Sequence, residues 1–261
     1  MPASLKTPTL FVVAACVLFP SLLHAQPVPS RSRFLHWTYQ DAAALASDLD
    51  NPRTPLFVLG ATAALTSLST LDQSIDYRMG TYGGAFGSYL EWTNTLGGPE
   101  INLPVAGIFA VSLLTNNSKF QDAAFTSLQS MVYAGVLSYG IKYTLGRARP
   151  YESDGAHHFA PFSGHNSFPS GHTTTAFAVL TPWVLYYPHP VTYGLFALST
   201  GTAVARIVRE KHWATDVLAG GTLGFVTAYY LTRRHQGAAG RVSITPLLGA
   251  NAASVHVRVT L

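Results

Sequence analysis

The segment FPSGHTTTAFAVL, residues 168–180, joins a Pro-Ser-Gly-His turn directly to three threonines and an apolar run. Pro169 is typical of a turn or a helix start, and Gly171 allows the backbone to come close to a ligand. The peptide N–H groups at a helix N-terminus favour an anion. The segment therefore predicts a buried helix whose first turn, with Ser170 and His172, faces an anionic group. The alternative is an ordinary serine N-cap followed by an incidental histidine.

Similar apolar segments lie on both sides of this one. Each is bounded by Gly, Pro, Asn or charged residues, the usual helix boundaries, and they cover about 56–71, 104–114, 126–145, 173–187, 191–208 and 215–232. The stretch 37–52 also has helical composition and stops at Pro52, whereas the Gly-rich stretches 77–89 and 94–104 are expected to be connections. We therefore expect an all-α bundle of about six helices with the active site at one end.

The composition indicates a protein that buries an unusual share of its residues. Apolar residues make up 48% of the 261 residues and charged residues 11%, whereas soluble domains usually contain about 25% charged residues. The net charge of +4 is modest, and no long Lys/Arg run is present. Nucleic acid is therefore not an expected partner, while an anionic substrate or an anionic membrane surface fits the weakly basic balance.

The N-terminus has the pattern of a secretory signal. Lys6 precedes an apolar run, and a small residue, Ala25, marks a plausible cleavage point. An uncleaved anchor, or a lipoprotein signal at Cys16, are the alternatives. Because Cys16 is the single cysteine, the processed chain would have no disulfide. The expected organisation is a signal peptide at 1–25, a leader and first helix at 26–55, a helical bundle at 56–235 and a tail at 236–261.

The N-terminal signal pattern predicts export, but the sequence does not decide whether the apolar helices span a membrane. A spanning helix needs about 20 mostly apolar residues, and most of the segments here are shorter or contain several polar residues. Buried helices of a water-soluble bundle and helices of a membrane bundle are both compatible with this. We expect a periplasmic or inner-membrane protein with its active site facing the periplasm, in which the weak segment 104–114 does not span.

The tail has a different periodicity. Apolar and polar residues alternate in two runs around a Gly-Ala-Asn turn, with Val255, Val257, Val259 and Leu261 on one face. This predicts a C-terminal β-hairpin. Packing against the bundle is its expected role, and a docking edge is the alternative.

Two further clusters of polar residues accompany the Pro-Ser-Gly-His turn. In KYTLGRARP, residues 142–150, Lys142 and Arg149 follow an apolar helix, where cations also suit the helix dipole. In ARIVREKHWATD, residues 205–216, His212 and Asp216 are four residues apart and share a helix face. An aspartate bonded to one imidazole nitrogen leaves the other nitrogen as a nucleophile or base. A local pair that only ties a helix end is the alternative.

Taken together, the three clusters resemble the three-part signature of the type 2 phosphatidic acid phosphatase and vanadium haloperoxidase superfamily. The matching patterns are Lys142-x6-Arg149-Pro150, Pro169-Ser170-Gly171-His172 and Arg206-x5-His212-x3-Asp216. The resemblance covers about residues 126–232 and favours the lipid phosphatase branch. One departure is Ala205, where the family usually has a serine before the arginine.

The resemblance implies a role for each matching residue. His212 would attack phosphorus and form a phosphohistidine, Asp216 would orient it, and His172 would protonate the leaving alkoxide. The phosphoryl oxygens would be held by a set of cations and donors: Lys142, Arg149, Ser170, Gly171 and Arg206. Phosphoryl transfer depends mostly on positioning and on electrostatic stabilisation, so this set requires no metal or other cofactor. The implied substrate is a phosphorylated lipid at a membrane.

Several alternatives remain open at this level. A vanadate-dependent haloperoxidase, a soluble periplasmic acid phosphatase and a non-catalytic anion-binding envelope protein are compatible with the same pocket. A zinc hydrolase could use His157, His158 and His165, although a solvated loop is the simpler interpretation. Arg147 could contact a second phosphate or face solvent. The identity of the lipid, the oligomeric state and the role of the tail are not indicated by the sequence.

Overall fold

A computed structural model describes residues 31–49, 65, 67–82, 87–152, 155–237, 242–249 and 252–259. The predicted signal peptide, at 1–25, and most of the apolar segment 56–71 lie outside these residues. The predicted division into four segments and the total of six bundle helices therefore stay predictions.

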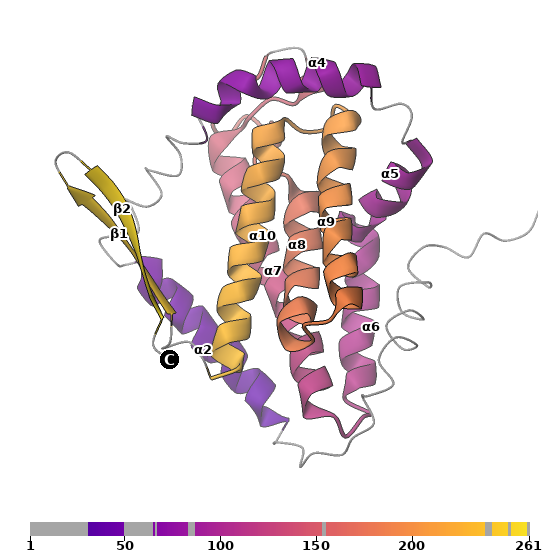
Figure 1. Ribbon diagram of the computed structural model, residues 1–261, viewed down its shortest axis with the longest axis vertical. Coiled ribbons are helices and arrows are strands. Elements are labelled where there is room, and N and C mark those ends of the chain that lie inside the picture. Colours follow the sequence, from indigo (N-terminus) through magenta and orange to yellow (C-terminus); the bar gives the residue numbers. More distant parts are fainter. Residues whose placement is uncertain are drawn as a thin grey trace, which may run out of the picture.

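The described chain is built around helices that run side by side (Figure 1). They are α6 (Asn102–Ser112), α7 (Ser118–Leu145), α8 (Gly171–Tyr186), α9 (Pro190–Val208) and α10 (Ala214–His235). Helix α8 is central, since it packs against α7, α9 and α10. The all-α class is confirmed, and these helices lie where the apolar segments from 104 to 232 predicted them.

Two glycines on α10 let it approach α8 closely. A Cβ atom at Gly220 would lie 2.5 Å from the carbonyl oxygen of Ser170, and one at Gly224 would lie 2.2 Å from that of Thr174. Real Cβ atoms do not tolerate such distances, so only glycine permits this packing. As a result the first turns of both helices lie together, and the Ser170 N–H donates to the Asp216 carbonyl oxygen at 2.9 Å.

The apolar core of the bundle lies between these helices in two clusters. One contains Ile108, Phe120, Ala123, Ala124, Trp183 and Tyr186. The other contains Leu96, Ile101, Val105, Val179 and Leu180. Apolar side chains from α6, α7 and α8 thus fix the relative positions of the helices that carry the polar motifs.

The first described helix is α2 (Ser32–Leu49), which agrees with the helical composition of 37–52. Its Asp41 is buried and accepts from Arg234 at 2.7 Å and from His235 at 2.8 Å, both at the end of α10. The ring of Trp37 stacks on His235, with centroids 4.0 Å apart. This polar and aromatic contact lies at the C-terminal end of α10, whereas the sequence motifs meet near its start.

The prediction that 77–89 is a connection was wrong. The helices α4 (Asp72–Tyr82) and α5 (Gly87–Asn94) cover most of it, and the 3-10 helix η2 (Ser69–Leu71) precedes α4. Both helices contact α9, and α4 also contacts α10 and lies across the end of the bundle (Figure 1). Glycine disfavours a helix by about 1 kcal/mol per residue, and these tertiary contacts offset that cost.

The second Gly-rich stretch, 94–104, is also more ordered than expected. It forms two 3-10 turns, η4 (Thr95–Gly97) and η5 (Pro99–Ile101), before α6 begins. Leu96 and Ile101 are buried in the core, so apolar side chains anchor this connection against α8.

The tail contains two strands, β1 (Val242–Gly249) and β2 (Ala252–Val259), which pair antiparallel. Val242 is opposite Val259, and Gly249 is opposite Ala252. The packing role predicted for this tail stays a prediction.

In the part of the chain that the structure describes, a single helix is long and apolar enough to cross a membrane. It is α9 (Pro190–Val208), and a third of its most apolar window is buried inside the protein. The segment 104–114 forms the shorter α6, as its composition suggested.

Candidate active site

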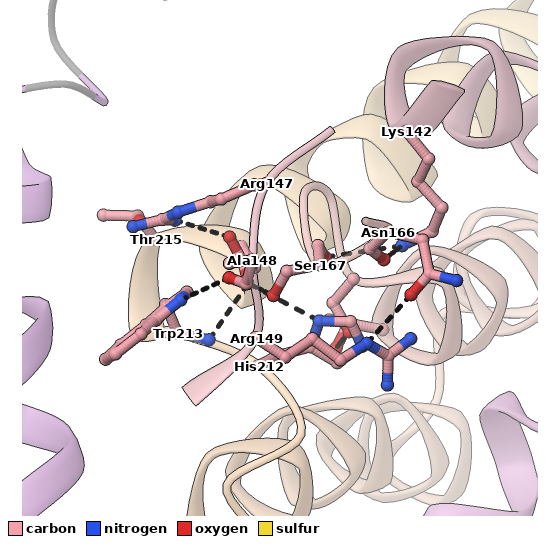
Figure 2. A network of polar contacts seen from close by, with 12 residues as sticks. Lys142, Arg147, Ala148, Arg149, Asn166, Ser167, His212, Trp213 and Thr215 are labelled. Carbon is pink, nitrogen blue, oxygen red and sulfur yellow. Dashed lines mark hydrogen bonds and ion pairs between the residues drawn. The ribbon is translucent and has the colours of Figure 1, made fainter. Parts of the chain in front are cut away.

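The three motifs meet at one end of the bundle. Lys142 lies in the last turn of α7, His172 in the first turn of α8, Arg206 near the end of α9, and Asp216 in the first turn of α10. His212 lies in the loop between α9 and α10. Figure 2 shows Lys142, Arg149 and His212 around the short segment that contains Asn166 and Ser167. Elements far apart in the sequence thus form one polar site.

His212 and Asp216 form a buried pair. The Nδ1 atom of His212 lies 3.5 Å from Oδ2 of Asp216, and the two side chains are 2% and 0% exposed. The His212 N–H donates to the carbonyl oxygen of Arg206 at 3.2 Å, which fixes the loop. Burial lowers the pKa of His212 to about 4, although the adjacent Asp216 opposes this shift. The imidazole is therefore neutral at pH 7.

Asp216 is held by donors from several segments. Its Oδ2 accepts from the Trp213 N–H at 3.0 Å and from the Ser167 hydroxyl, and its Oδ1 accepts from Nη1 of Arg147 at 2.5 Å. Burial acts to raise the pKa of Asp216, but hydrogen bonding to His212 and the charge of Arg147 together hold it below its ordinary value. Asp216 is therefore a fixed negative charge beside His212.

The cations Lys142 and Arg149 share one anchor. Lys142 Nζ donates to the carbonyl oxygens of Asn166 at 2.6 Å and Ser167 at 3.4 Å. Arg149 Nε donates to the side-chain oxygen of Asn166 at 2.9 Å (Figure 2). Burial, and then the charge of Arg149, lower the pKa of Lys142 to about 8. Both cations are thus positioned by the residues just before the Pro-Ser-Gly-His turn.

The third cation of the motifs, Arg206, enters from α9. It is 7% exposed, and its Nη1 donates to the side-chain oxygen of Asn94 at 2.9 Å. Its Nε is buried and has no hydrogen-bond partner among the described residues. Asn94, at the end of α5, therefore holds one nitrogen of the guanidinium group, while the Nε donor is not used by the described residues.

The first turn of α8 lies close to Lys142. A Cβ atom at Gly171 would have the Lys142 Cε as its nearest neighbour, at 3.6 Å, so the cation and the helix N-terminus occupy the same region. Ser170 is fully buried, forms no side-chain cap, and has its hydroxyl 3.0 Å from that of Thr173. Ser170 therefore does not act as an ordinary serine N-cap.

His172 lies in a strongly cationic environment. Burial, followed by electrostatic interactions with Arg206, His212, Arg149 and Lys142, lowers its pKa to about 3. Its main chain is in contact with Gly97, where a Cβ atom would lie 2.1 Å from the His172 carbonyl oxygen. The unliganded imidazole is therefore neutral, and a bound anion would raise its pKa by offsetting the cations.

The chain turns sharply between Lys142 and Arg149. Gly146 ends α7 in the left-handed region, at φ 56°, and its N–H donates to the Lys142 carbonyl oxygen at 3.0 Å. A Cβ atom there would lie 1.9 Å from the carbonyl oxygen of Ala160, so a glycine is required. The turn directs Arg147 and Arg149 into different parts of the site (Figure 2).

Both expectations for Arg147, contact with a second phosphate and exposure to solvent, were wrong. It is 1% exposed, so it neither faces solvent nor offers itself to a second phosphate. Its Nη1 donates to Asp216 and to the Thr215 hydroxyl, its Nη2 donates to Asp72 at 2.7 Å, and Nε and Nη2 both donate to the Ala156 carbonyl oxygen. All its nitrogens therefore have acceptors within the protein.

The loop histidines His165 and His157 have different polar partners. His165 Nδ1 lies 3.0 Å from a carboxylate oxygen of Glu152, and its ring meets that of His158 edge to face at 5.4 Å. His157 Nδ1 lies 3.3 Å from the Ser69 hydroxyl. Within the described ranges, no group of three or more His, Cys, Asp or Glu residues is arranged to hold a metal ion. The zinc hypothesis thus gains no geometric support from this loop.

Sequence reasoning missed four residues of the site. Asn166 and Ser167 directly precede the Pro-Ser-Gly-His turn, and their polarity was a signal that could have been used. Asp72 and Asn94 lie more than a hundred residues before His212, on helices that overlap the stretches expected to be connections. No local pattern relates them to the motifs.

Comparisons with known proteins agree with the motifs and with the fold. Residues 123–239, a little under half of the chain, match the family model described as the PAP2 superfamily. The crystal structure of a transmembrane PAP2 type phosphatidylglycerolphosphate phosphatase from Bacillus subtilis superposes with a TM-score of 0.55. The alignment covers 70% of this chain and 94% of that one at 21% identity, which supports the fold. The resemblance predicted from the motifs is therefore confirmed over residues 123–239.

Among curated proteins, the chain is similar to lipid A 1-phosphatases. It is 36% identical to that of Rhizobium johnstonii over 100 residues, which cover 36% of this chain and 41% of that one. It is 38% identical to that of Porphyromonas gingivalis over 104 residues, covering 38% of this chain and 21% of the relative. The chain thus spans less than half the length of these relatives.

Proposed function

We propose that this protein is a metal-independent phosphatase that hydrolyses a phosphate monoester or diphosphate of a membrane lipid through a phosphohistidine at His212. The observation that carries this proposal is the buried His212–Asp216 pair, 3.5 Å apart, beside the cations Lys142 and Arg149. A neutral imidazole oriented by a carboxylate is a competent nucleophile, and the cations supply the electrostatic stabilisation that phosphoryl transfer needs.

In the first step, the Nε2 lone pair of His212 attacks phosphorus as the bond to the leaving oxygen breaks. The tautomer with its proton on Nδ1, facing Asp216, presents that lone pair. Lys142, Arg149 and Arg206 hold the phosphoryl oxygens, together with the N–H groups at the start of α8 and the hydroxyl of Ser170. The buried Nε of Arg206, which lacks a described partner, is one such donor.

His172 supplies the proton that the leaving alkoxide takes. The substrate phosphate offsets the surrounding cations, which raises the low pKa of His172 and allows its ring to carry that proton. In the second step the neutral ring accepts a proton from water, the water oxygen bonds to phosphorus, and the N–P bond breaks. His212 is thereby regenerated, and inorganic phosphate leaves.

The proposed substrate class is a lipid with a terminal phosphate, and lipid A 1-phosphate is the first candidate. The similarity to lipid A 1-phosphatases supports this choice, within the shared 100 residues. The apolar composition and the apolar helix α9 support an enzyme that meets its substrate at a membrane.

The location proposed for the enzyme is the inner membrane or the periplasm, with the active-site end of the bundle facing the periplasm. The proposed organisation is a removable signal at 1–25, a leader and first helix at 26–55, a catalytic bundle of about six helices at 56–235, and a β-hairpin tail at 236–261. The pattern of the first 25 residues supports export.

Phosphate release by the purified protein tests the proposal. The assay contains EDTA and compares lipid A, phosphatidic acid, phosphatidylglycerol phosphate, undecaprenyl diphosphate and a soluble aryl phosphate. His212→Ala is compared with His165→Ala, a partly exposed histidine outside the proposed chemistry. We expect release from at least one lipid that survives EDTA, is retained in His165→Ala and is lost in His212→Ala. Undiminished release by His212→Ala would overturn the mechanism.

A further inference from the structure

A chain of buried charges connects α4 to the proposed nucleophile. Asp72 is the first residue of α4 and is fully buried. Its Oδ2 accepts from Nη2 of Arg147 at 2.7 Å, and the Nη1 of the same guanidinium group donates to Oδ1 of Asp216 at 2.5 Å. Asp216 in turn faces His212. Asp72, Arg147, Asp216 and His212 are therefore linked in that order.

Thr215 completes this network. Its N–H donates to Oδ1 of Asp72 at 2.9 Å, its hydroxyl donates to Oδ2 of Asp72 at 2.5 Å, and the same hydroxyl accepts from Nη1 of Arg147 at 2.8 Å. Thr215 is adjacent to Asp216 in the first turn of α10. Asp72 is thus fixed both by the arginine and by the helix that carries Asp216.

Asp72, Arg147 and Thr215 are not among the residues that define the three sequence motifs. Asp72 lies outside residues 123–239, the segment that the family model matches, and it reaches the site because α4 crosses the end of the bundle (Figure 1). Arg147 lies between Lys142 and Arg149, but it turns away from them to join Asp72. The network is therefore a separate contribution to the site.

The charge balance explains why two carboxylates share one arginine. A buried ion pair is costly unless each charge is compensated and hydrogen-bonded. If Arg147 had Asp216 as its single carboxylate partner, its charge would largely cancel the negative charge that His212 needs beside it. With Asp72 on the other side of Arg147, the three groups together keep one net negative charge, and it faces His212.

We propose that Asp72 is a positioning residue for the phosphatase reaction, acting on His212 through Arg147 and Asp216. It holds the guanidinium group in place and offsets its charge, so that Asp216 remains an effective negative partner for the imidazole as it becomes phosphorylated. The inference rests on the proposed function.

Replacing Asp72 should also change the pH dependence of the reaction. The charged and titratable groups around His212 are Asp216 on α10, Lys142 on α7, His172 on α8, Arg206 on α9, and Arg149, with Arg147 behind Asp216. Removing the negative charge of Asp72 leaves Arg147 to act on Asp216 alone. The pKa of His212 then falls further, so the acid limb of kcat/KM moves to lower pH, while kcat falls because the phosphohistidine is less stabilised.

Asp72→Asn is the test variant, and Asp41→Asn is its matched control. Asp41 is also a buried carboxylate and has two side-chain partners on α10, Arg234 and His235, but these lie at the C-terminal end of that helix. Asp72→Asn is expected to lower kcat at least about 10-fold with KM changed less than about 2-fold, and to shift the acid limb to lower pH. Asp41→Asn is expected to lower thermal stability to a similar extent and to leave the pH profile in place.

A pH profile of Asp72→Asn that superimposes on that of the wild type would overturn the inference, because a purely structural role of Asp72 gives that result. If Asp72→Asn does not fold, Thr215→Val decides by the same readouts. This near-isosteric change removes the hydroxyl between Asp72 and Arg147, and the inference requires a smaller shift in the same direction. A wild-type protein without phosphatase activity would contradict the proposed function, whereas an active wild type with unshifted variants contradicts the positioning role.

Discussion

Nδ1 of His212 lies 3.5 Å from Oδ2 of Asp216, and neither side chain has more than 2% of its surface exposed. The distance exceeds that of a short hydrogen bond, so in the unliganded protein the pair is aligned without being tightly bonded. Asp216 is meanwhile fully engaged by Arg147, Ser167 and the Trp213 N–H. The carboxylate is therefore the fixed member of the pair, and in the proposed mechanism the imidazole is the member that adjusts as phosphorus approaches.

Asp216→Asn should lower kcat by about 10²- to 10⁴-fold with little change in KM. The asparagine keeps the shape of the side chain but loses the charge that stabilises a phosphorylated imidazole and selects its tautomer. Steady-state kinetics on the best lipid substrate check this. The melting temperature of the variant serves as the control, and a kcat within about 3-fold of the wild type would contradict the role of Asp216.

Stability should fall as the pH drops from about 6.5 toward 4. The pKa of His212 is lowered to about 4 and that of His172 to about 3 by burial, both below the ordinary value of 6.5. Between pH 6.5 and pH 4 these histidines bind more protons in the unfolded chain than in the folded one. The free energy of unfolding therefore decreases as the pH falls through this range. For His212 alone the loss is about 3 kcal/mol.

Thermal unfolding at pH 7.5, 6, 5 and 4.5 measures that loss. The His212→Gln variant should have a flatter dependence on pH, because it lacks one of the two groups. An equally steep dependence in the variant would show that other residues cause it.

Asn94→Ala should weaken phosphate binding by about 3- to 10-fold. Asn94 accepts from Nη1 of Arg206 at 2.9 Å, and losing such a bond to a charged group costs about 1 kcal/mol or more. Competitive inhibition by inorganic phosphate provides the measurement. The neighbouring Thr95→Ala, which removes a local bond to the Trp92 carbonyl oxygen, is the control and should leave the inhibition constant unchanged.

Gly224→Ala should destabilise the protein by about 1–3 kcal/mol or more, since the added methyl group would overlap the Thr174 carbonyl oxygen. Gly107→Ala on α6 is the matched control. A Cβ atom there meets nothing within 4 Å, and replacing a helical glycine should stabilise the helix by up to about 1 kcal/mol. Equal melting temperatures for the two variants would contradict the close packing of α8 on α10.

The sequence was sufficient for the all-α class, for the helices α6 to α10 and for the three motifs that meet at one end. Apolar runs bounded by Gly, Pro and charge identify such helices locally. It was not sufficient for α4 and α5, because their glycines disfavour helices and their tertiary contacts with α9 are not visible in a local pattern.

The role of Arg147 was missed for a related reason. A cation between two motif cations suggests a ligand contact or a solvent-exposed position, and its true partners depend on where Asp72 lies. That position follows from the path of α4 across the bundle, about seventy residues earlier in the chain. Long-range placement of a single carboxylate leaves no periodicity or spacing to detect.

The most direct test of the central claim is rapid-quench trapping of the phosphoenzyme. The wild-type protein is mixed with its best lipid phosphate for milliseconds, quenched in base, where phosphohistidine is stable, and digested for mass spectrometry. The account predicts a phosphoryl group on the peptide that contains His212. Turnover without any phosphorylated peptide, or a phosphoryl group on another residue, would contradict it.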